Sequence, residues 1–423
     1  MNRGRLLCYV CLAAGATSGV GLVLRTCDLS SVASNKLSLG PDMRTVKAGE
    51  TSPFRLRFAA PLGEPLEFSD LDFLRHRFAL RRGADLAKVV HLLHLCCSNP
   101  AAPLEAGDRT GSISELSSVL LDQRRAAEWY PGHSFFIIHT AHGLRYVTST
   151  AGVAGDITAQ PHVDQVLALF ADLNLPATTR LHVMHGDAAL EDVLRDCLAN
   201  FQLSGEFEWS VLGLIRYSPS DHVWENRFGE SYTLDDIVRA LIAKPLSSAS
   251  CGGTHTLFTL GAIAQISSLH RGLSREVADL LDRYLCATLN HVIETQLADG
   301  SFDPKWYCSV ETAAWYQGLV TKVRRELPDR AWLATGAGRA ACIEPLSPMV
   351  EKTQKVLATG HHLEWIGLLP SREQPSREPI EKAAQFLHDS LISAEDEQIE
   401  ASFCPYSHAL SALVYLSSKN VAG

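Results

Sequence analysis

The residues of this chain best suited to chemistry are His361 and Glu364, which lie three positions apart in the run TGHHLEW. On a helix, residues at this spacing share a face, so the imidazole and the carboxylate would lie side by side, with Trp365 on the same side. A histidine beside a carboxylate can be tuned near neutral pH to remove and return a proton next to a carbonyl, as epimerisation or aldose–ketose isomerisation requires. The alternative is a buried histidine that its own carboxylate orients to join helices.

A second candidate is the segment CGGTH at positions 251–255. Cys251 and His255 are four apart and can share a helical face, where Cys308 or His361 would complete a zinc site. The alternative is a helix start made by two glycines, capped by Thr254. The segment is similar to the zinc-linked CGGTH of alanyl-tRNA synthetase editing domains, but the rest of that metal set precedes the motif in an α/β context. Here an apolar helix is expected to follow it, so we set that resemblance aside.

Two further histidine pairs have ligand-like spacing, His91 with His94 and His182 with His185. Both pairs lie in apolar segments of the sequence without neighbouring carboxylates, so we expect core or surface histidines there rather than metal ligands. The chain contains no phosphate-binding loop or dinucleotide fingerprint, so nucleotide-dependent chemistry is not expected. It also contains no serine nucleophile motif. It lacks the aspartate-rich stretch that polyprene cyclisation needs.

The composition indicates a globular protein with an acidic surface. The 423 residues are 46% hydrophobic and 20% charged, with a formal net charge of -9. These values exclude wholesale disorder and a membrane protein of many spans. The negative balance argues against nucleic-acid partners, because binding to phosphates needs a positive field. The 11 cysteines are sparse over this length, and we do not expect an ordered disulfide framework.

The amino terminus predicts export. Arg3 and Arg5 precede an apolar run from Leu6 to Leu24, which suits either a retained single-pass anchor or a cleaved signal peptide over residues 1–29. Residues 30–53 follow as a linker. We expect the body to lie in the cell envelope outside the cytoplasm, attached to the membrane through this N-terminal segment.

Helical periodicity dominates the rest of the chain. The exception is 134–150, where β-branched and aromatic residues around Ala141-His142-Gly143 predict a single hairpin. Helices are expected at 86–97, 116–129, 161–174, 188–201, 206–217, 234–243, 253–269, 274–297, 310–325, 354–368, 377–392 and 405–417. About six helix pairs would close into an α/α toroid, and an open helical solenoid is the alternative. The predicted fold is mainly α, with a small α+β portion at 54–160 and the toroid at 161–423.

One motif resembles a known structural repeat. Residues 296–302, QLADGSF, with Trp306 following, are similar to the QxxDGSW repeat of terpene cyclases and related prenyltransferase-like toroids. In those proteins the repeat fastens a helix end to the next helix pair. Phe302 replaces the tryptophan here, and the chain has one clear copy. The resemblance implies the toroid fold, with terpene-cyclase-like chemistry as a further alternative function.

The run TGHHLEW is similar to the GHxxEW signature of the N-acylglucosamine 2-epimerase superfamily, whose members are also α/α barrels. The resemblance implies that His361 and Glu364 work at a sugar and that His408 is the partner histidine. The arginine- and tryptophan-rich motifs of the early barrel helices are missing, so this resemblance covers about a tenth of the chain.

The order of the motifs from about residue 160 to the end resembles a group of uncharacterised, membrane-anchored bacterial toroid proteins, which implies no activity. Our leading hypothesis is a sugar epimerase-like or isomerase-like enzyme without a cofactor, with zinc as the lesser alternative. Its catalytic residues would be His361 as acid and base, Glu364 orienting it and His408 as the opposing base. Trp365, His255 and Trp306 would bind the substrate. The second hypothesis is a non-catalytic toroid that binds a glycan or an envelope partner.

Overall fold

The computed structural model describes residues 52–58, 65–78, 80, 82–97, 113–133, 136–148, 157–184, 186–218, 223–270, 272–327, 348–370 and 373–417. The chain divides into two compact units, 1–45 and 46–423, and the described residues all belong to the second. This unit is mainly helical with small antiparallel sheets, which confirms the predicted class.

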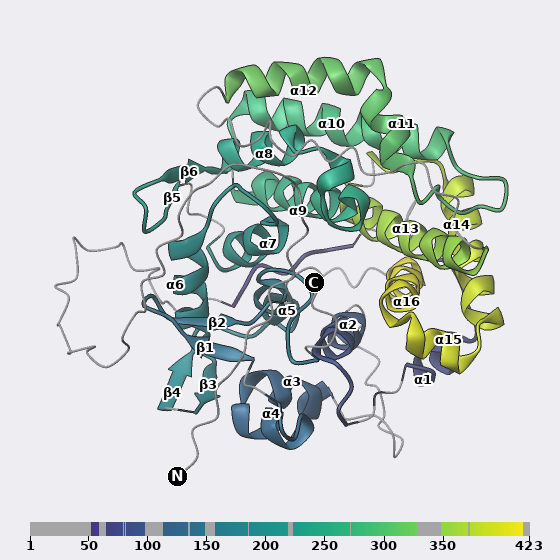
Figure 1. Ribbon diagram of the computed structural model, residues 1–423. Helices are drawn as coiled ribbons and strands as arrows, with labels where there is room; N and C mark the ends of the chain where they lie inside the picture. The colour runs from purple at the N-terminus through teal and green to yellow at the C-terminus, as the bar shows by residue number, and fades with distance from the viewer. Residues whose placement is uncertain are drawn as a thin grey trace, which may run out of the picture. The chain divides into compact units, whose positions relative to one another are not determined.

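Six helices form a closed circuit of contacts, in which each packs against the next and the last returns to the first. They are α2 (Leu86–Cys97), α5 (Gln165–Asp172), α7 (Glu208–Tyr217), α9 (Thr254–His270), α13 (Pro348–Leu368) and α16 (Phe403–Ser417). The circuit can be followed in Figure 1 in this order. The helix α2, from the portion expected to be α+β, closes it by contacting both α5 and α16.

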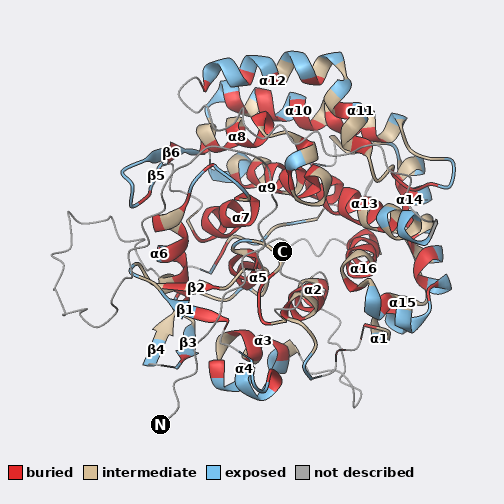
Figure 2. Cartoon of the chain, viewed as in Figure 1, coloured by how far each residue is buried: buried red, intermediate tan, exposed pale blue. Residues whose placement is uncertain are grey.

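The other helices pack outside this circuit. α3 contacts α2, α6 contacts α7, α8 and α10 contact α9, and α14 contacts both α13 and α16. In Figure 2, buried residues dominate α7 and α16, whereas α12 exposes much of its surface. The bounds are α1 Leu71–His76, α3 Ile113–Leu121, α4 Gln123–Trp129, α6 Leu190–Asn200, α8 Leu234–Ala243, α10 Arg275–Glu294, α11 Trp306–Thr312, α12 Ala314–Glu326, α14 Arg377–Ser393 and α15 Asp396–Ala401, with 3-10 turns η2 Leu246–Ser248 and η3 Ser250–Gly253.

The hairpin expected at 134–150 is present as β1 (Ile137–His139) and β2 (Leu144–Tyr146), with Ile137 opposite Tyr146. The described residues contain two more hairpins that the sequence did not predict. These are β3 (Arg180–Val183) with β4 (Gly186–Ala189), and β5 (Val223–Glu225) with β6 (Ser231–Thr233). Unlike 134–150, these segments do not lie within a long run of β-branched and aromatic residues, which is the signal that predicted the first hairpin.

Local sequence explains where several helices begin. Thr233 caps α8 by accepting a hydrogen bond from the backbone of Asp236, whose carboxylate accepts one from the Thr233 backbone in return. Ser274 caps α10 through the backbone of Val277. The run at 310–325 is a single helix in the prediction but two in the structure, because the backbone is extended at Ala313.

The turn at 296–302 follows α10 and connects it to α13 and α14 through hydrogen bonds. The Gln296 side chain donates to the carbonyls of Gly300 and of Pro379 on α14, at 2.8 and 2.9 Å. The backbone N–H of Phe302 donates to the Thr359 hydroxyl on α13 at 2.9 Å. Gly300 has a φ of +86°, and a Cβ there would lie 2.5 Å from the backbone oxygen of Lys382. Only glycine fits this position without rearrangement.

The expected membrane anchor is not supported. Within the part of the chain that the structure describes, no helix combines the length and the apolar character needed to cross a membrane. This finding corrects the predicted membrane attachment and membrane-anchored location. The segment Leu6–Leu24 and residues 30–51 of the expected linker lie outside the described residues.

Helices α13 and α16 approach each other most closely at Gly360. A Cβ at this position would lie 2.9 Å from the backbone nitrogen of Ala409 and 2.9 Å from the carbonyl carbon of His408. A side chain can relieve such a clash by changing its rotamer, but backbone atoms inside a helix cannot. The missing Cβ therefore allows the two helices to pack backbone against backbone next to His361.

We predict that Gly360→Ala lowers the free energy of unfolding by about 1–3 kcal/mol, because the added methyl group must push α13 and α16 apart. The matched control is Gly318→Ala on α12, where a Cβ meets nothing within 4 Å. The control should stabilise the protein by about 0.5–1 kcal/mol, the usual gain of alanine over glycine in a helix. Urea denaturation followed by circular dichroism measures both, and equal midpoints for the two variants would contradict the close approach.

Candidate functional site

Three of the residues predicted to act together do meet in the interior. Glu364 accepts a hydrogen bond from His361 Nδ1 at 3.1 Å, one helical turn before it on α13. It also accepts from His408 Nδ1 on α16, at 3.0 Å to each carboxylate oxygen. All three side chains are buried, with at most 4% of each residue exposed. One carboxylate thus holds two imidazoles from two helices.

The charges at this triad follow from burial and contact. Burial would raise the pKa of Glu364, but His408 and His361 outweigh it and lower that pKa well below its usual range. Burial opposes a charge on His408 too, yet Glu364 raises its pKa. The pKa of His361 falls to about 4, because burial and the neighbouring His408 both disfavour its charged form. Glu364 is therefore ionised between the two imidazoles, and His361 is neutral at pH 7.

More histidines extend the triad in both directions. The His91 ring on α2 lies 5.2 Å from that of His408, between ring centroids. On the other side, the His255 ring on α9 lies 5.0 Å from His361, and the His162 ring, just before α5, lies 4.7 Å from His255. Together with His361 and Glu364, these residues form what we call the hub. Its side chains come from four of the circuit helices and the segment that leads into a fifth.

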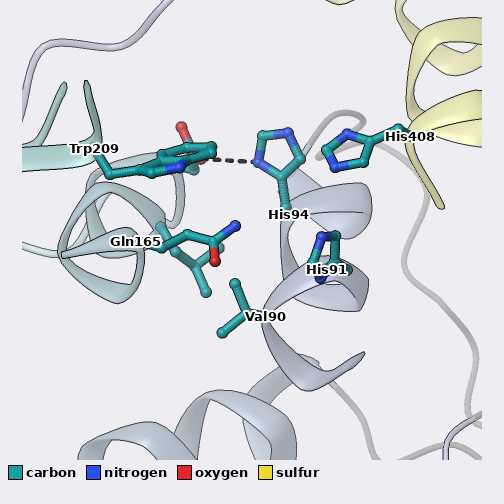
Figure 3. A pocket seen from close by; sticks show the side chains of 8 residues that line it. Val90, His91, His94, Gln165, Trp209 and His408 are labelled. Carbon is teal, nitrogen blue, oxygen red and sulfur yellow. Dashed lines mark hydrogen bonds and ion pairs between the residues drawn. The ribbon is translucent and has the colours of Figure 1, made fainter. Parts of the chain in front are cut away.

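A small cavity adjoins the hub, with a volume of about 10 Å³, which is room for about one water molecule. In Figure 3, His91, His94 and His408 lie beside one another, across from Gln165 and Trp209. His94 Nδ1 contacts Asp172 at 3.0 Å, and Asp172 also pairs with the buried Arg216. The lining consists of Val90, His91, His94, Gln165, Leu169, Asp172, Trp209 and His408.

Several buried ring nitrogens have no hydrogen-bond partner among the described residues. They include His91 Nε2, His255 Nδ1 and His361 Nε2. Buried polar atoms are nearly always paired, so unpaired nitrogens gathered in one place are candidates to bind a ligand. Burial lowers the pKa of each of these three histidines, which leaves a lone pair free at pH 7. Neutral imidazole is the form that binds metal ions.

Among the described residues, three groups of side chains place potential ligand atoms within 4.8 Å of one another. One is His361 with Glu364 and His408, whose facing atoms are already hydrogen-bonded to each other. The other two groups each contain two histidines and a cysteine, namely His91, Cys404 and His408, and His162, Cys251 and His255. The hub therefore contains side chains that can hold a metal ion.

The two tryptophans predicted to bind substrate lie elsewhere. Trp365 is fully buried, and its Nε1–H donates to His362 Nδ1 at 2.8 Å. The Trp306 ring lies 4.7 Å from His362, and Phe302 packs against the same histidine at 5.2 Å. These aromatic residues surround His362 rather than the cavity beside His408. His255, the third predicted binding residue, lies in the hub.

Sequence reasoning missed four residues of this region. His91 is buried, as expected of a core histidine, but neither it nor His94 was proposed as a site residue, and His162 was only part of the expected helix at 161–174. All three lie in or beside the hub. Cys404 was not singled out. The signal that could have found it is a repeated spacing, since Cys404 precedes His408 by four residues just as Cys251 precedes His255. By contrast, His182 is half-exposed and pairs with Asp187 on a hairpin.

Compared with known proteins, the chain matches no family model, no curated protein and no solved structure. The resemblances to toroid enzymes and to toroid proteins of the bacterial envelope therefore stay predictions from short motifs. The chemistry of this chain has to be argued from its own residues.

His362 makes acid stability a direct test of this interior. Burial lowers its pKa from 6.5 to about 3, so below about pH 6.5 the unfolded chain binds a proton that the folded protein does not. The free energy of unfolding should thus be highest above that pH and fall on acidification, by about 1.4 kcal/mol per pH unit for this group.

We predict that His362→Gln removes about that much of the pH slope between about pH 6 and pH 4, since glutamine does not titrate and still offers Trp365 an acceptor. Exposed His133→Gln, in the turn after α4, is the control and should leave the slope unchanged. Urea denaturation at a series of pH values measures both variants. An unchanged slope in His362→Gln would show that this histidine already binds its proton in the folded state.

Proposed function

We propose that this protein is an α/α toroid whose hub binds a zinc-class metal ion and uses it to activate water in a small buried cavity. The fold proposal is supported by the closed circuit of six helices, with further helices packed outside it. In such a fold the inward faces of helices that are distant in sequence meet at one place. That is where the histidines of α2, α9, α13 and α16 gather.

The observation that carries the metal proposal is the set His91, Cys404 and His408, whose ligand atoms lie within 4.8 Å of one another. His91 Nδ1 contacts the Ala87 carbonyl at 2.6 Å, and His408 Nδ1 contacts Glu364. Both imidazoles are thus oriented through Nδ1, which leaves Nε2 for the metal. Metal-binding histidines use this arrangement, with the second ring nitrogen bonded to a carbonyl or carboxylate.

Two imidazoles and a thiolate suit zinc, and three protein ligands leave a fourth position for water, as in catalytic zinc sites. His91 and His408 both line the cavity with room for about one water. A zinc ion in such a site lowers the pKa of its water to about 7. The protein would hold and orient the ligands through Glu364 and Ala87, while His94 and Asp172 supply hydrogen-bonding groups across the cavity.

Acid–base chemistry on a sugar is the second candidate. The hydrogen bonds that join His361, Glu364 and His408 favour it. The neighbouring cavity of about 10 Å³ is too small for a sugar ring in the conformation described, and Trp365 is not among the residues that line it. We therefore rank this hypothesis below the metal site. Glycan binding without catalysis and terpene-cyclase-like chemistry stay predictions, and the small cavity favours neither of them.

The metal content of the purified full-length protein tests the proposal. We predict that Cys404→Ser lowers bound zinc by about one equivalent per chain after dialysis, measured by plasma mass spectrometry, because the thiolate is lost. The control is Cys286→Ser on α10, a residue of similar partial burial outside the circuit helices. It should bind as much zinc as the wild type.

Cobalt substitution gives an independent readout of the same site. The cobalt-loaded wild type should absorb in the thiolate-to-cobalt charge-transfer region, and Cys404→Ser should lose part of that absorption while keeping its helical circular-dichroism signal. Equal zinc content and equal cobalt spectra in the wild type and Cys404→Ser would rule out this site.

A further inference from the structure

We infer that the hub binds a second metal ion of the same class, held by His162, Cys251 and His255. One ligand atom from each of these residues lies within 4.8 Å of the others. None of the three belongs to the first set, so the two sites do not compete for ligands. This inference deepens the proposed function, although its evidence is separate.

The second set repeats the chemistry of the first. In each, a cysteine precedes a histidine by four positions near the start of a circuit helix. Cys404 and His408 both lie in α16, where residues four apart share a face. Cys251 lies in the turn η3, which leads into α9, and His255 is in the first turn of that helix. A third imidazole then comes from a segment earlier in the chain, His91 in the first set and His162 in the second.

The histidines of the second set are positioned for a ligand. His162 Nδ1 contacts Glu206 at 2.7 Å, which leaves its other ring nitrogen for the metal. Glu206 is itself fixed by hydrogen bonds from the Ser250 hydroxyl and the Val163 backbone. A carboxylate behind a metal-binding histidine is the usual way to orient the ring. His255 Nδ1 is buried and has no hydrogen-bond partner among the described residues.

The backbone at Cys251 determines where its thiol lies. Its φ of +51° places a residue with a side chain in the left-handed region, at a cost of about 1–3 kcal/mol unless its surroundings enforce it. The Thr254 hydroxyl donates to the Cys251 carbonyl at 2.9 Å and holds this turn. Strained residues of this kind cluster at functional sites. Here the strained turn brings a thiol to His162 and His255.

The expected partners of Cys251 and His255 were Cys308 or His361. Cys308 is disulfide-bonded, so it cannot serve as a thiolate ligand. His361 contacts the His255 ring but bonds Glu364 through Nδ1. It lies between the two sets, because its ring centroid is 3.8 Å from that of His408 and 5.0 Å from that of His255. His162, which the sequence did not suggest, is the third ligand instead.

Zinc stoichiometry of the full-length protein tests the inference. We expect His162→Gln and Cys251→Ser each to lower bound zinc by about one equivalent per chain relative to the wild type. The matched control is His182→Gln, which also removes a histidine paired with a carboxylate, 2.8 Å from Asp187, but on the β3–β4 hairpin. It should leave the zinc content unchanged. Because the His162 side chain is 19% exposed, His162→Gln should fold even if Cys251→Ser does not.

The double variant Cys251→Ser/Cys404→Ser separates this inference from the proposed function. Two independent sites predict that it loses about two equivalents. If His162→Gln and Cys251→Ser keep the wild-type zinc content, the second site is refuted, whatever Cys404→Ser shows. If only Cys404→Ser keeps it, the first site fails and the second stands. If each single variant loses as much zinc as the double variant, the six residues form one site, and the inference of a separate ion is wrong.

Discussion

The interior of this protein depends on one buried carboxylate. Glu364 is 2% exposed, and an ionised carboxylate at such a position is costly unless donors surround it. His361 and His408 supply those donors from α13 and α16. The pairing fixes the orientation of both rings, so their second nitrogens point to defined places. The metal site at His408 and the alternative of proton transfer by His361 both need this fixed orientation.

Much of the fold could be predicted from sequence, because long helices leave a strong periodic pattern. The expected helices at 86–97 and 234–243 match α2 and α8 residue for residue, and the hairpin around Ala141-His142-Gly143 is present. Short elements escaped detection for a physical reason. A helix of six residues, such as α1, carries too few residues for a helical period to show.

The candidate site was only partly predictable. The contact between His361 and Glu364 could be predicted, because both residues lie on one helix and a spacing of three puts their side chains on the same face. His91 and His162 reach the hub through the packing of distant segments, which no local pattern reveals. The aromatic residue Trp365 shows the limit of a helical-face argument. It lies one position after Glu364, yet it bonds to His362 and belongs to a different cluster. The spacing of residues along one helix predicts which of its side chains are neighbours, but the packing of the helices decides which side chains of other helices they meet.

The contact at Gly360 ties the chemistry of the hub to the relative sliding of two helices. Because α13 and α16 touch backbone to backbone there, neither can shift along the other without a steric clash. Adding or removing one residue inside either helix, between Gly360 and Glu364 or before His408, would turn the following side chains by about 100° around the axis. These two helices should therefore tolerate no change in length near the hub.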